Sequence, residues 1–342
     1  MSKKNSSVNL KKGFTEFKEL SNIFNNFKIT LDSLNKKKYL VAVSGGPDSL
    51  ALTALTKAYY YQRKTKFHYV LIDHNIRKNS HKEAKKVKNI LKRKKIELKI
   101  ILNKRKIVKN IQANARHLRY EILLNYCKKY KISTLLTAHN FEDQIETFFI
   151  RLSRGSGLKG LSAMKPISKI STKVSLCRPL LGVKKMFLIK ISNNTFGKYI
   201  KDPSNKDKKY LRTKIRSLKK PLEKSGVKYD QIFRSIQNLS SSKLILEKYF
   251  NKLFKDLIVK KGKEVLINFE KFKKLEKVAK IALINEAIRI LKKNYYELRS
   301  KKIENLLFNL NKGNFKRSTL GGCIFFKKNQ NLCLKDEKLG VN

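Results

Sequence analysis

The sequence predicts an α/β fold, a doubly wound parallel sheet, followed by a smaller, mostly helical α+β domain. Two observations lead to this prediction. Short apolar segments alternate with segments of helical length through the first half of the chain, as in repeated βαβ units. One apolar segment ends in a glycine turn that opens a helix. Polar residues likewise follow the carboxyl ends of other apolar segments, and open α/β sheets bind their ligands at the carboxyl ends of strands.

The expected strands are continuous apolar runs, which is typical of parallel strands covered on both faces. They are expected at Tyr39–Ser44, Phe67–Asp73, Glu97–Leu102 and Thr134–Thr137. The segments between and after them have the length and pattern of amphipathic helices, which are expected at Pro47–Gln62, Ser80–Lys94, Ile111–Tyr130 and Phe141–Ser153.

The pattern differs at both ends of the chain. Residues 1–37 are rich in Lys and Asn, with a short apolar helix expected around Phe14, Phe17 and Leu20. After about Lys219, helices are expected at Leu244–Leu257, Phe272–Leu291 and Lys302–Leu310, and short strands at Phe315–Leu334. We therefore expect an N-terminal extension at 1–37, an α/β domain at 38–218 and a C-terminal domain at 219–342.

Composition indicates the kind of partner. A formal charge of +56 and a hydrophobic fraction of 41% indicate a protein with a real core and a polyanionic partner. The lysines are spread over the whole chain, so part of this charge could be general compositional drift. The arginines are mildly concentrated between Arg116 and Arg216, which favours positions that need a planar, bidentate cation.

The location and the cysteines are expected to be ordinary. The apolar runs are shorter than a membrane span, and the polar N-terminus lacks the apolar core of a signal peptide, so we expect a cytoplasmic protein. No two cysteines form a Cys-x-x-Cys pair, and their spacing matches no zinc site, so we expect buried thiols at Cys127, Cys177, Cys323 and Cys333.

The glycine turn Ser44-Gly-Gly-Pro-Asp-Ser49 predicts a phosphate site. Glycines allow close backbone approach, Pro47 suits the first helical position, and free N–H groups at a helix start attract an anion. Asp48 could hold Mg²⁺ against phosphate oxygens. The spacing fits neither a Walker A loop nor the dinucleotide-binding fingerprint, and the alternative is a plain structural turn.

A second group follows the fourth expected strand. Asp143 and Glu146 share one helix face, and His139 lies at the helix entry. Such a set could orient an amine, bind Mg²⁺ and move a proton. Alternatively, the carboxylates only complement the helix dipole.

Two further strand ends carry candidate residues. Asp73 and His74 could contact a nucleoside, while Ser80 and Glu83 fit a capping box. On the helix at 111–130, Arg116 and Arg119 lie outside the apolar stripe and could clamp a phosphate or a developing oxyanion; they could equally be solvated charges.

A basic cluster follows the turn sequence at 202–205. Arg212 and Arg216 lie four residues apart with Lys214 between them, which predicts a surface for a phosphate backbone. The turn sequence Asp202-Pro-Ser-Asn205 is ordinary turn chemistry.

Taken in order, these segments resemble the tRNA(Ile)-lysidine synthase family of the N-type ATP pyrophosphatase, or PP-loop, superfamily. The resemblance runs from Val41 to Arg216 and is loose after Lys219. It rests on Ser44–Ser49, Asp73-His74, Ala115–Tyr120, Ala138–Thr147, Arg151–Leu161, Arg178–Leu181 and Asp202–Asn205.

The resemblance implies a reaction in two steps. ATP adenylates the wobble cytidine of a CAU-anticodon tRNA(Ile), and the amine of free L-lysine then displaces AMP to give lysidine. It also implies a PP-loop catalytic domain, a tRNA-binding or accessory C-terminal domain and a Mg²⁺ ion. The sequence does not give the oligomeric state, and a homodimer stays an open alternative to a monomer.

The resemblance also implies roles for individual residues. The catalytic residues would be Asp48, Arg119, His139, Asp143 and Glu146. ATP would be bound by Ser44, Gly45, Gly46, Pro47, Asp48, Ser49, Asp73 and His74. Mg²⁺ would be held by Asp48 and Asp143, and tRNA phosphates by Arg116, Arg151, Arg154, Arg212 and Arg216.

Two alternatives stay open at this point. A PP-loop thiolation enzyme would share the loop but generally needs paired cysteines or an iron–sulfur cluster, and no Cys-x-x-Cys is present. A non-catalytic basic RNA-binding protein would bind tRNA in a salt-sensitive way without ATP turnover, and the intact set of Asp48, Asp143 and Glu146 argues against it.

Overall fold

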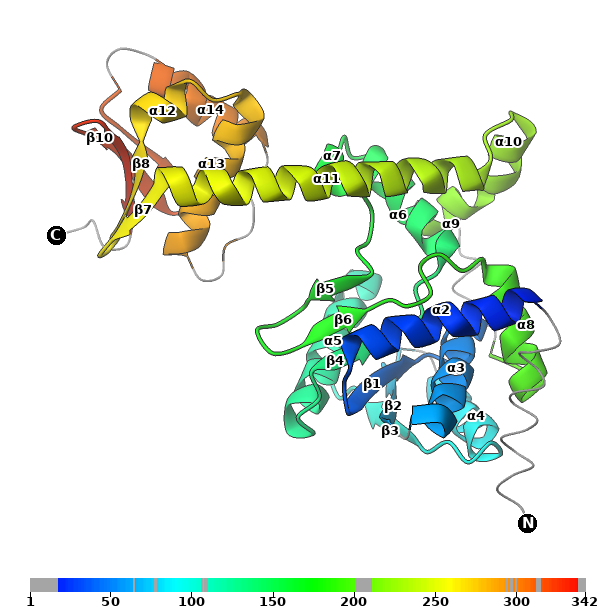
Figure 1. The fold of residues 1–342 in the computed structure, drawn as a ribbon. Helices are drawn as coiled ribbons and strands as arrows, with labels where there is room; N and C mark the ends of the chain where they lie inside the picture. The colour runs from blue at the N-terminus through cyan, green and yellow to red at the C-terminus, as the bar shows by residue number, and fades with distance from the viewer. Residues whose placement is uncertain are drawn as a thin grey trace. The chain divides into compact units, whose positions relative to one another are not determined.

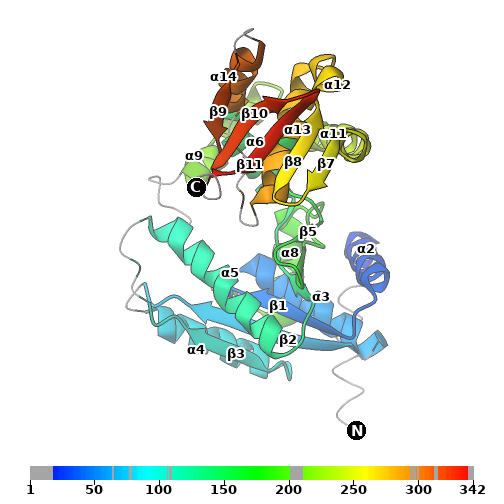
Figure 2. The ribbon, with the colours of Figure 1, turned by 90° about the vertical axis from the view of Figure 1, so that its left-hand side faces the viewer.

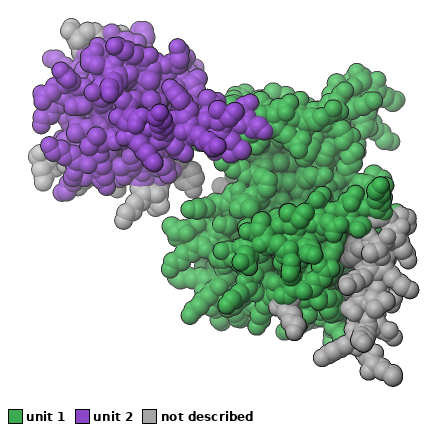
Figure 3. Space-filling view, viewed as in Figure 1, with its two compact units in different colours: residues 1–240 green, residues 241–342 purple. Residues whose placement is uncertain are grey.

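The computed structural model describes residues 18–63, 65–76, 79–105, 107, 110–200, 211–292, 295, 298, 300–311 and 315–337. The chain forms two compact units, residues 1–240 and 241–342, which Figure 3 shows in different colours. No helix in the described part of the chain has the length and apolar character needed to span a lipid bilayer. The domain boundaries expected near residues 37 and 218 stay a prediction.

The first unit contains the doubly wound sheet that the sequence predicts (Figures 1 and 2). Its strands run in the order β3-β2-β1-β4-β6-β5, and all neighbours are parallel except β5 with β6. The bounds are β1 (Lys38–Val43), β2 (Lys66–Asp73), β3 (Leu98–Leu102), β4 (Thr134–Leu136), β5 (Ile167–Lys169) and β6 (Ser175–Cys177). The order reverses between β1 and β4, so the loops after these two strands diverge at a switch point.

The four helices predicted after these strands are confirmed, each starting at the expected residue and ending within two residues of the expected end. They are α3 (Pro47–Arg63), α4 (Ser80–Lys92), α5 (Ile111–Lys129) and α6 (Phe141–Leu152). Helix α2 (Lys18–Leu34) precedes the sheet and contains Leu20, whereas Phe14 and Phe17 lie outside the described residues. The segment between α6 and the second unit adds α7 (Leu158–Leu161), α8 (Lys185–Phe196), α9 (Leu211–Ser217) and α10 (Lys219–Lys224).

Alternate residues of β1 enter two different cores, as expected for a strand covered on both faces. Tyr39 and Val41 pack with residues of α2, α3, α4 and α8, while Leu40 packs with α5. Figure 2 shows α5 and α4 on opposite faces of the sheet. Burial on both faces explains why the strand reads as an unbroken apolar run.

The capping box expected at Ser80 and Glu83 is wrong. Asn79 is the N-cap of α4 and makes no side-chain cap hydrogen bond. Ser80 is already helical, so its hydroxyl does not occupy the extended N-cap position from which it could accept the N–H three residues on. A capping box is found instead at the start of α6, between Asn140 and Asp143.

The second unit is the smaller α+β domain that the sequence predicts. Its antiparallel sheet has the order β7-β8-β11-β10-β9, and α13 and α14 pack against it in one core. The strands are β7 (Ile258–Lys261), β8 (Glu264–Asn268), β9 (Arg317–Leu320), β10 (Cys323–Lys328) and β11 (Asn331–Asp336). The helices are α11 (Tyr229–Leu257), whose first residues belong to the first unit, α12 (Phe269–Lys273), α13 (Lys277–Leu291) and α14 (Ser300–Asn311).

Three elements in the last part of the chain differ from expectation. The helix expected at Leu244–Leu257 begins at Tyr229, and the single helix expected at Phe272–Leu291 is the pair α12 and α13. The hairpin of β7 and β8 was not predicted. Its strands are short, and the lysines of β7 interrupt the apolar alternation that would mark a strand.

Helix α2 offers a matched test of the first core. Leu31 is 0% exposed and packs in the core with α3, whereas Ile29 on the same helix is 65% exposed. We expect Leu31→Ala to lower the free energy of unfolding by about 2–5 kcal/mol, and Ile29→Ala by no more than about 0.5 kcal/mol. Urea unfolding followed by circular dichroism measures both. Equal losses for the two variants would contradict the packing of α2 on the sheet.

Candidate active site

The loop after β1 is held in shape by one buried hydroxyl. Ser49 Oγ accepts hydrogen bonds from the backbone N–H groups of Ser44 and Gly45, both at 3.1 Å, and donates to Gly46 O at 3.0 Å. The loop therefore curls around the start of α3, so the positive end of the helix and its free N–H groups lie at the mouth of the loop.

Gly45 meets two separate constraints. Its φ angle is +85°, a region that side chains rarely adopt, and a Cβ there would lie 2.4 Å from Cγ2 of Val87 on α4. Gly45 O also accepts a hydrogen bond from the Ile200 N–H at 2.9 Å. Gly46 is less constrained, since a Cβ would meet only Ser44 Oγ at 3.8 Å.

Asp48 is the carboxylate of this loop. Its Oδ1 is buried and has no hydrogen-bond partner among the described residues, and its Oδ2 lies 3.7 Å from Nζ of Lys185 on α8. Burial raises the pKa of Asp48 to about 6; the Lys185 charge and a side-chain hydrogen bond from Asn140 oppose the rise, and the Asp143 charge adds to it. An acceptor oxygen that is buried without a partner is the kind of group that a bound cation would satisfy.

The loop after β4 brings the second group beside the first, because β4 pairs directly with β1. His139 Nδ1 lies 2.9 Å from Thr137 Oγ1. Burial lowers the pKa of His139 to about 4 against the opposing effect of Asp143, so the imidazole is neutral near pH 7. A neutral ring can accept or donate a hydrogen bond without adding charge to the site.

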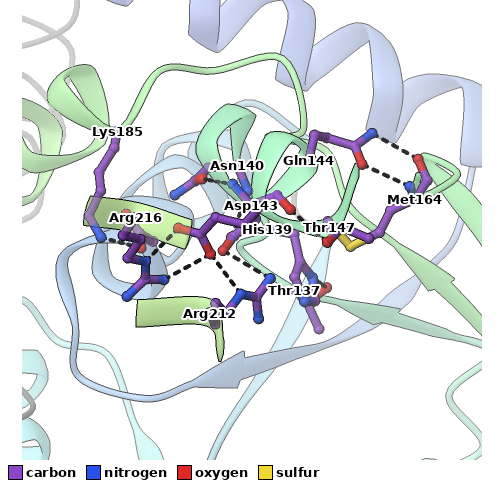
Figure 4. A network of polar contacts seen from close by, with 12 residues as sticks. Thr137, His139, Asn140, Asp143, Gln144, Thr147, Met164, Lys185, Arg212 and Arg216 are labelled. Atoms are coloured by element: carbon purple, nitrogen blue, oxygen red, sulfur yellow. Dashed lines mark hydrogen bonds and ion pairs between the residues drawn. The ribbon is translucent and has the colours of Figure 1, made fainter. Parts of the chain in front are cut away.

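Asp143 has a structural role as well as a candidate chemical one. Its Oδ2 accepts the Asn140 N–H at 3.1 Å, and Asn140 Oδ1 accepts the Asp143 N–H at 3.0 Å (Figure 4). Its Oδ1 lies 3.5 Å from Nη2 of Arg212. One carboxylate oxygen therefore anchors the helix start and the other faces the charged cluster.

Glu146 is 3% exposed and is held by two arginines of α9. Arg212 Nε donates to its Oε2 at 2.6 Å, and Arg216 donates from Nε to Oε1 at 2.5 Å and from Nη2 to Oε2 at 3.2 Å. Both carboxylate oxygens are thus engaged. Figure 4 shows Arg212 and Arg216 converging with Asp143 and Lys185. A buried carboxylate paired in this way ties α9 to α6.

The predicted nucleoside contacts after β2 lie at the adjacent strand end. Asp73 is 3% exposed; its Oδ1 accepts the Asn75 N–H at 3.0 Å, and its Oδ2 lies 3.3 Å from His81 Nδ1. Arg119 Nε lies 3.4 Å from His74 Nε2. Burial and the nearby Arg119 charge lower the pKa of His74 to about 4, so this ring is also neutral near pH 7.

The predicted phosphate-binding arginines do not form one cluster. Arg116 is exposed on α5, and its guanidinium lies 5.1 Å from the ring centre of Tyr120. Arg151 Nη1 donates to the carbonyls of Gly160 and Ala163, both at 2.7 Å, and so holds the glycine loop after α6. Arg154 is exposed beyond the end of α6. Of these five arginines, only Arg212 and Arg216 contact the carboxylates of α6.

Lys185 is a site residue that the sequence reasoning missed. Its side chain reaches Asp48, and its backbone N–H donates to Glu142 Oε2 at 2.9 Å, which joins the start of α8 to the start of α6. In a chain with 81 lysines and arginines, one more lysine carries no signal. Its place four residues after the segment Arg178–Leu181, at a helix start, was the available clue.

The cysteines are buried, as expected. Burial raises the pKa of Cys127 and of Cys177 to about 12, so both are protonated thiols at neutral pH. Among the described residues, no group of three or more His, Cys, Asp and Glu side chains is placed to hold a metal ion. A Mg²⁺ ion would fit this site through one or two carboxylates together with substrate phosphates, which is its usual mode in phosphate chemistry.

Comparison with known proteins identifies relatives of the chain. Residues 16–222 match the model of the PP-loop domain. Proteins called tRNA(Ile)-lysidine synthase are similar: that of Orientia tsutsugamushi is 41% identical over 54% of this chain and 42% of its own length. Those of the Wolbachia of Brugia malayi and of Wolbachia pipientis wMel are each 32% identical, over 87% and 92% of this chain and 70% and 74% of theirs.

A solved structure supports the fold. The U34-tRNA thiolase of Methanococcus maripaludis, solved with its [4Fe-4S] cluster, covers 65% of this chain and 78% of its own with a TM-score of 0.55. At 21% identity the likeness concerns the architecture alone.

The two loop glycines provide a matched pair of variants. We expect Gly45→Ala to lower the free energy of unfolding by about 1–3 kcal/mol, because the added Cβ meets Val87 and the φ angle is unsuited to Ala. Gly46→Ala should change it by about 0.5 kcal/mol or less. Urea unfolding of both variants measures the difference. A Gly45→Ala protein as stable as Gly46→Ala would show that the loop does not adopt this conformation.

Proposed function

The chain belongs to the tRNA(Ile)-lysidine synthase family of PP-loop domain proteins, and from this premise we propose the reaction that it catalyses. It joins the amine of free L-lysine to the 2-position of the wobble cytidine in a CAU-anticodon tRNA(Ile), and converts ATP to AMP and pyrophosphate. The observation that supports this most directly is the position of Asp48 and Asp143 in the first turns of the helices that follow two paired strands.

ATP is proposed to place its β- and γ-phosphates on the loop of residues 44–49. The support is the curled backbone at the start of α3, where N–H groups and the helix dipole favour an anion. Lys185 adds a cation at the same mouth, 3.7 Å from Asp48. Asp73 and His74, at the next strand end, are proposed to face the nucleoside.

The donor set fits a Mg²⁺ ion, which Asp48 and Asp143 would hold together with the substrate phosphates. The buried Oδ1 of Asp48, without a partner among the described residues, supports this placement. When bound, the ion would neutralise phosphate charge and favour the departure of pyrophosphate. The protein side chains themselves orient the reactants and keep water from the activated base.

In the first step, the 2-oxo oxygen of the cytidine attacks the α-phosphorus, and the bond to the pyrophosphate oxygen breaks. The neutral imidazole of His139 and the charged guanidinium of Arg119 are proposed to orient the phosphate oxygens that gain charge. In the second step, the lysine nitrogen forms a bond to C2 and AMP leaves with the oxygen, while the amine loses a proton. Oδ1 of Asp143 is proposed to hold the amine, since its Oδ2 is engaged in the helix cap.

The geometry changes the emphasis within the proposed site. Glu146 is engaged on both oxygens by Arg212 and Arg216, so we propose that it positions α9 beside the reactants. Direct contact of either arginine with tRNA stays a prediction, as do the tRNA contacts of Arg116, Arg151 and Arg154, the cytoplasmic location and the homodimer.

Thiolation is the less favoured function. It needs a reactive thiolate or a cluster held by cysteines, and burial raises the pKa of Cys127 and Cys177 far above neutrality. Purely passive RNA binding is also less favoured, because it gives no role to a buried carboxylate whose Oδ1 has no hydrogen-bond partner in the described part of the chain.

A reconstituted reaction tests the proposed function. Purified protein is mixed with ATP, Mg²⁺, free lysine and tRNA(Ile) bearing CAU, and AMP and the mass of the tRNA cytidine are measured. We expect AMP release that needs tRNA, with one lysine added to the cytidine. The isosteric Asp48→Asn variant should lose at least about 100-fold in rate, because it lacks the negative charge that would hold Mg²⁺ at the phosphates. AMP release that depends on a sulfur donor would refute the proposal.

Lys185 and its neighbour Lys184 separate phosphate binding from surface charge. Lys185 faces Asp48, whereas Lys184 pairs with Asp230 at 2.9 Å. Lys185→Ala should raise KM for ATP about tenfold, since one charge-assisted phosphate contact is lost. Lys184→Ala should leave KM within about twofold of the parent value. Steady-state kinetics with ATP varied measures both, and equal effects would show that Lys185 has no special role.

A further inference from the structure

A cavity of about 540 Å³ lies on the α5 face of the sheet, between α5 and the hairpin of β5 and β6. Its walls include an aromatic ring, three apolar side chains and two guanidinium groups, from Arg116, Tyr120, Leu124, Ile170, Leu176 and Arg178. It is separate from the glycine loop, which lies after β1 at the start of α3. The proposed ATP site therefore does not account for it.

The cavity combines a flat apolar surface with cations. Leu176 is a member of the core under α5, and Tyr120, Leu124 and Ile170 pack against that core. Arg116 lies 5.1 Å from the ring centre of Tyr120, and its Nη2 lies 3.4 Å from the Tyr120 hydroxyl. The guanidinium therefore lies over one face of the ring, and aromatic rings and guanidinium planes are both surfaces on which a nucleobase stacks.

Arg178 is held by two hydrogen bonds, and one of its N–H groups has no partner among the described residues. Its Nη1 donates to Lys165 O at 2.8 Å and to Ser168 Oγ at 3.0 Å, while its Nε is buried without a hydrogen-bond partner among the described residues. Leaving a charged N–H buried and unpaired is costly, so a ligand acceptor is expected there. The one carboxylate of the cavity wall, Glu121, is taken by Arg105 at 2.8 and 2.9 Å.

The cavity lies near the proposed catalytic edge of the sheet. Arg178 directly follows β6, which pairs with β4, and His139 follows β4. The charges of Arg116 and Arg178 both act on His139 and lower its pKa. The wall of the cavity formed by Leu176 and Arg178 thus lies beyond β4 from β1 and its glycine loop, because β1 and β6 flank β4 on opposite sides.

We propose that this cavity receives one unstacked nucleotide of the RNA substrate, with its base on Tyr120 and its polar atoms on Arg116 and Arg178. The inference rests on the proposed function, under which that nucleotide is the wobble cytidine. Two arginines in a chain that otherwise prefers lysine favour planar recognition of a base and its phosphate over general attraction. The adenosine of ATP is the competing occupant, and the test separates the two.

Binding without turnover tests the cavity independently of the reaction. The full chain, as parent, Tyr120→Leu and Tyr120→Phe, is titrated with tRNA(Ile) bearing CAU and with the same tRNA abasic at the wobble position. We expect the abasic site to weaken parent binding about tenfold, as for the loss of one stacked base. Tyr120→Leu should weaken binding of the intact tRNA by about the same factor. Its affinity for the abasic tRNA should equal its affinity for the intact tRNA.

Tyr120→Phe is the matched control, because it keeps the ring and should retain both the affinity and the tenfold discrimination. Arg178→Lys removes the unpaired Nε while keeping the charge, and should lose part of the discrimination. Full additivity of Tyr120→Leu and the abasic site would overturn the proposal. So would a rise in KM for ATP in Tyr120→Leu with tRNA affinity unchanged. Failure of lysine incorporation with the binding pattern intact would instead refute the proposed function alone.

Discussion

The parallel pairing of β1 with β4 is the constraint on which the site depends. The two strands are far apart in the sequence, and their register sets Leu40 beside Leu135 and Val41 beside Leu136. The loops that follow must then emerge side by side, one leading to α3 and the other to α6. Because the strand order reverses here, neither loop is covered by a crossover from the other. The glycine loop and the acidic helix start thereby become neighbours.

Bringing carboxylates to one buried edge has an electrostatic cost, and the fold meets it with cations from later segments. Lys185 comes from α8, and Arg212 and Arg216 come from α9. Removing one partner would leave a buried charge uncompensated, which is generally far more destabilising than losing an exposed ion pair. Helices α8 and α9 are therefore tied to the sheet edge by the same charges that the chemistry would use. We infer that the proposed substrate phosphates and lysine amine bind at a site whose carboxylates and cations already neutralise one another.

Local patterns predicted much of this arrangement from the sequence. The strands and helices up to α6 follow from apolar runs and turn residues, and the grouping of Ser44 with His139 follows from the general rule for open sheets. What escaped prediction depends on distant pairing. Nothing near Glu146 in the sequence shows that arginines 66 and 70 residues later would engage it. The capping box predicted at Ser80 is wrong for the opposite reason. The local sequence fits a capping box, but the helix begins at Ser80 itself, one residue before the pattern requires.

The arginines also clarify what the high positive charge does. Among those described, Arg151 and Arg178 bond to backbone carbonyls, and Arg212 and Arg216 to carboxylates, each with directed N–H groups. The planar guanidinium is used where geometry matters, and most of the positive charge in this chain is lysine. Dispersed lysines attract a polyanion over a long range and with little direction, whereas specificity needs fixed donors. Under the proposed function, the few arginines and rings at the sheet edge would therefore discriminate one nucleotide, and the net charge of +56 would bring the RNA to them.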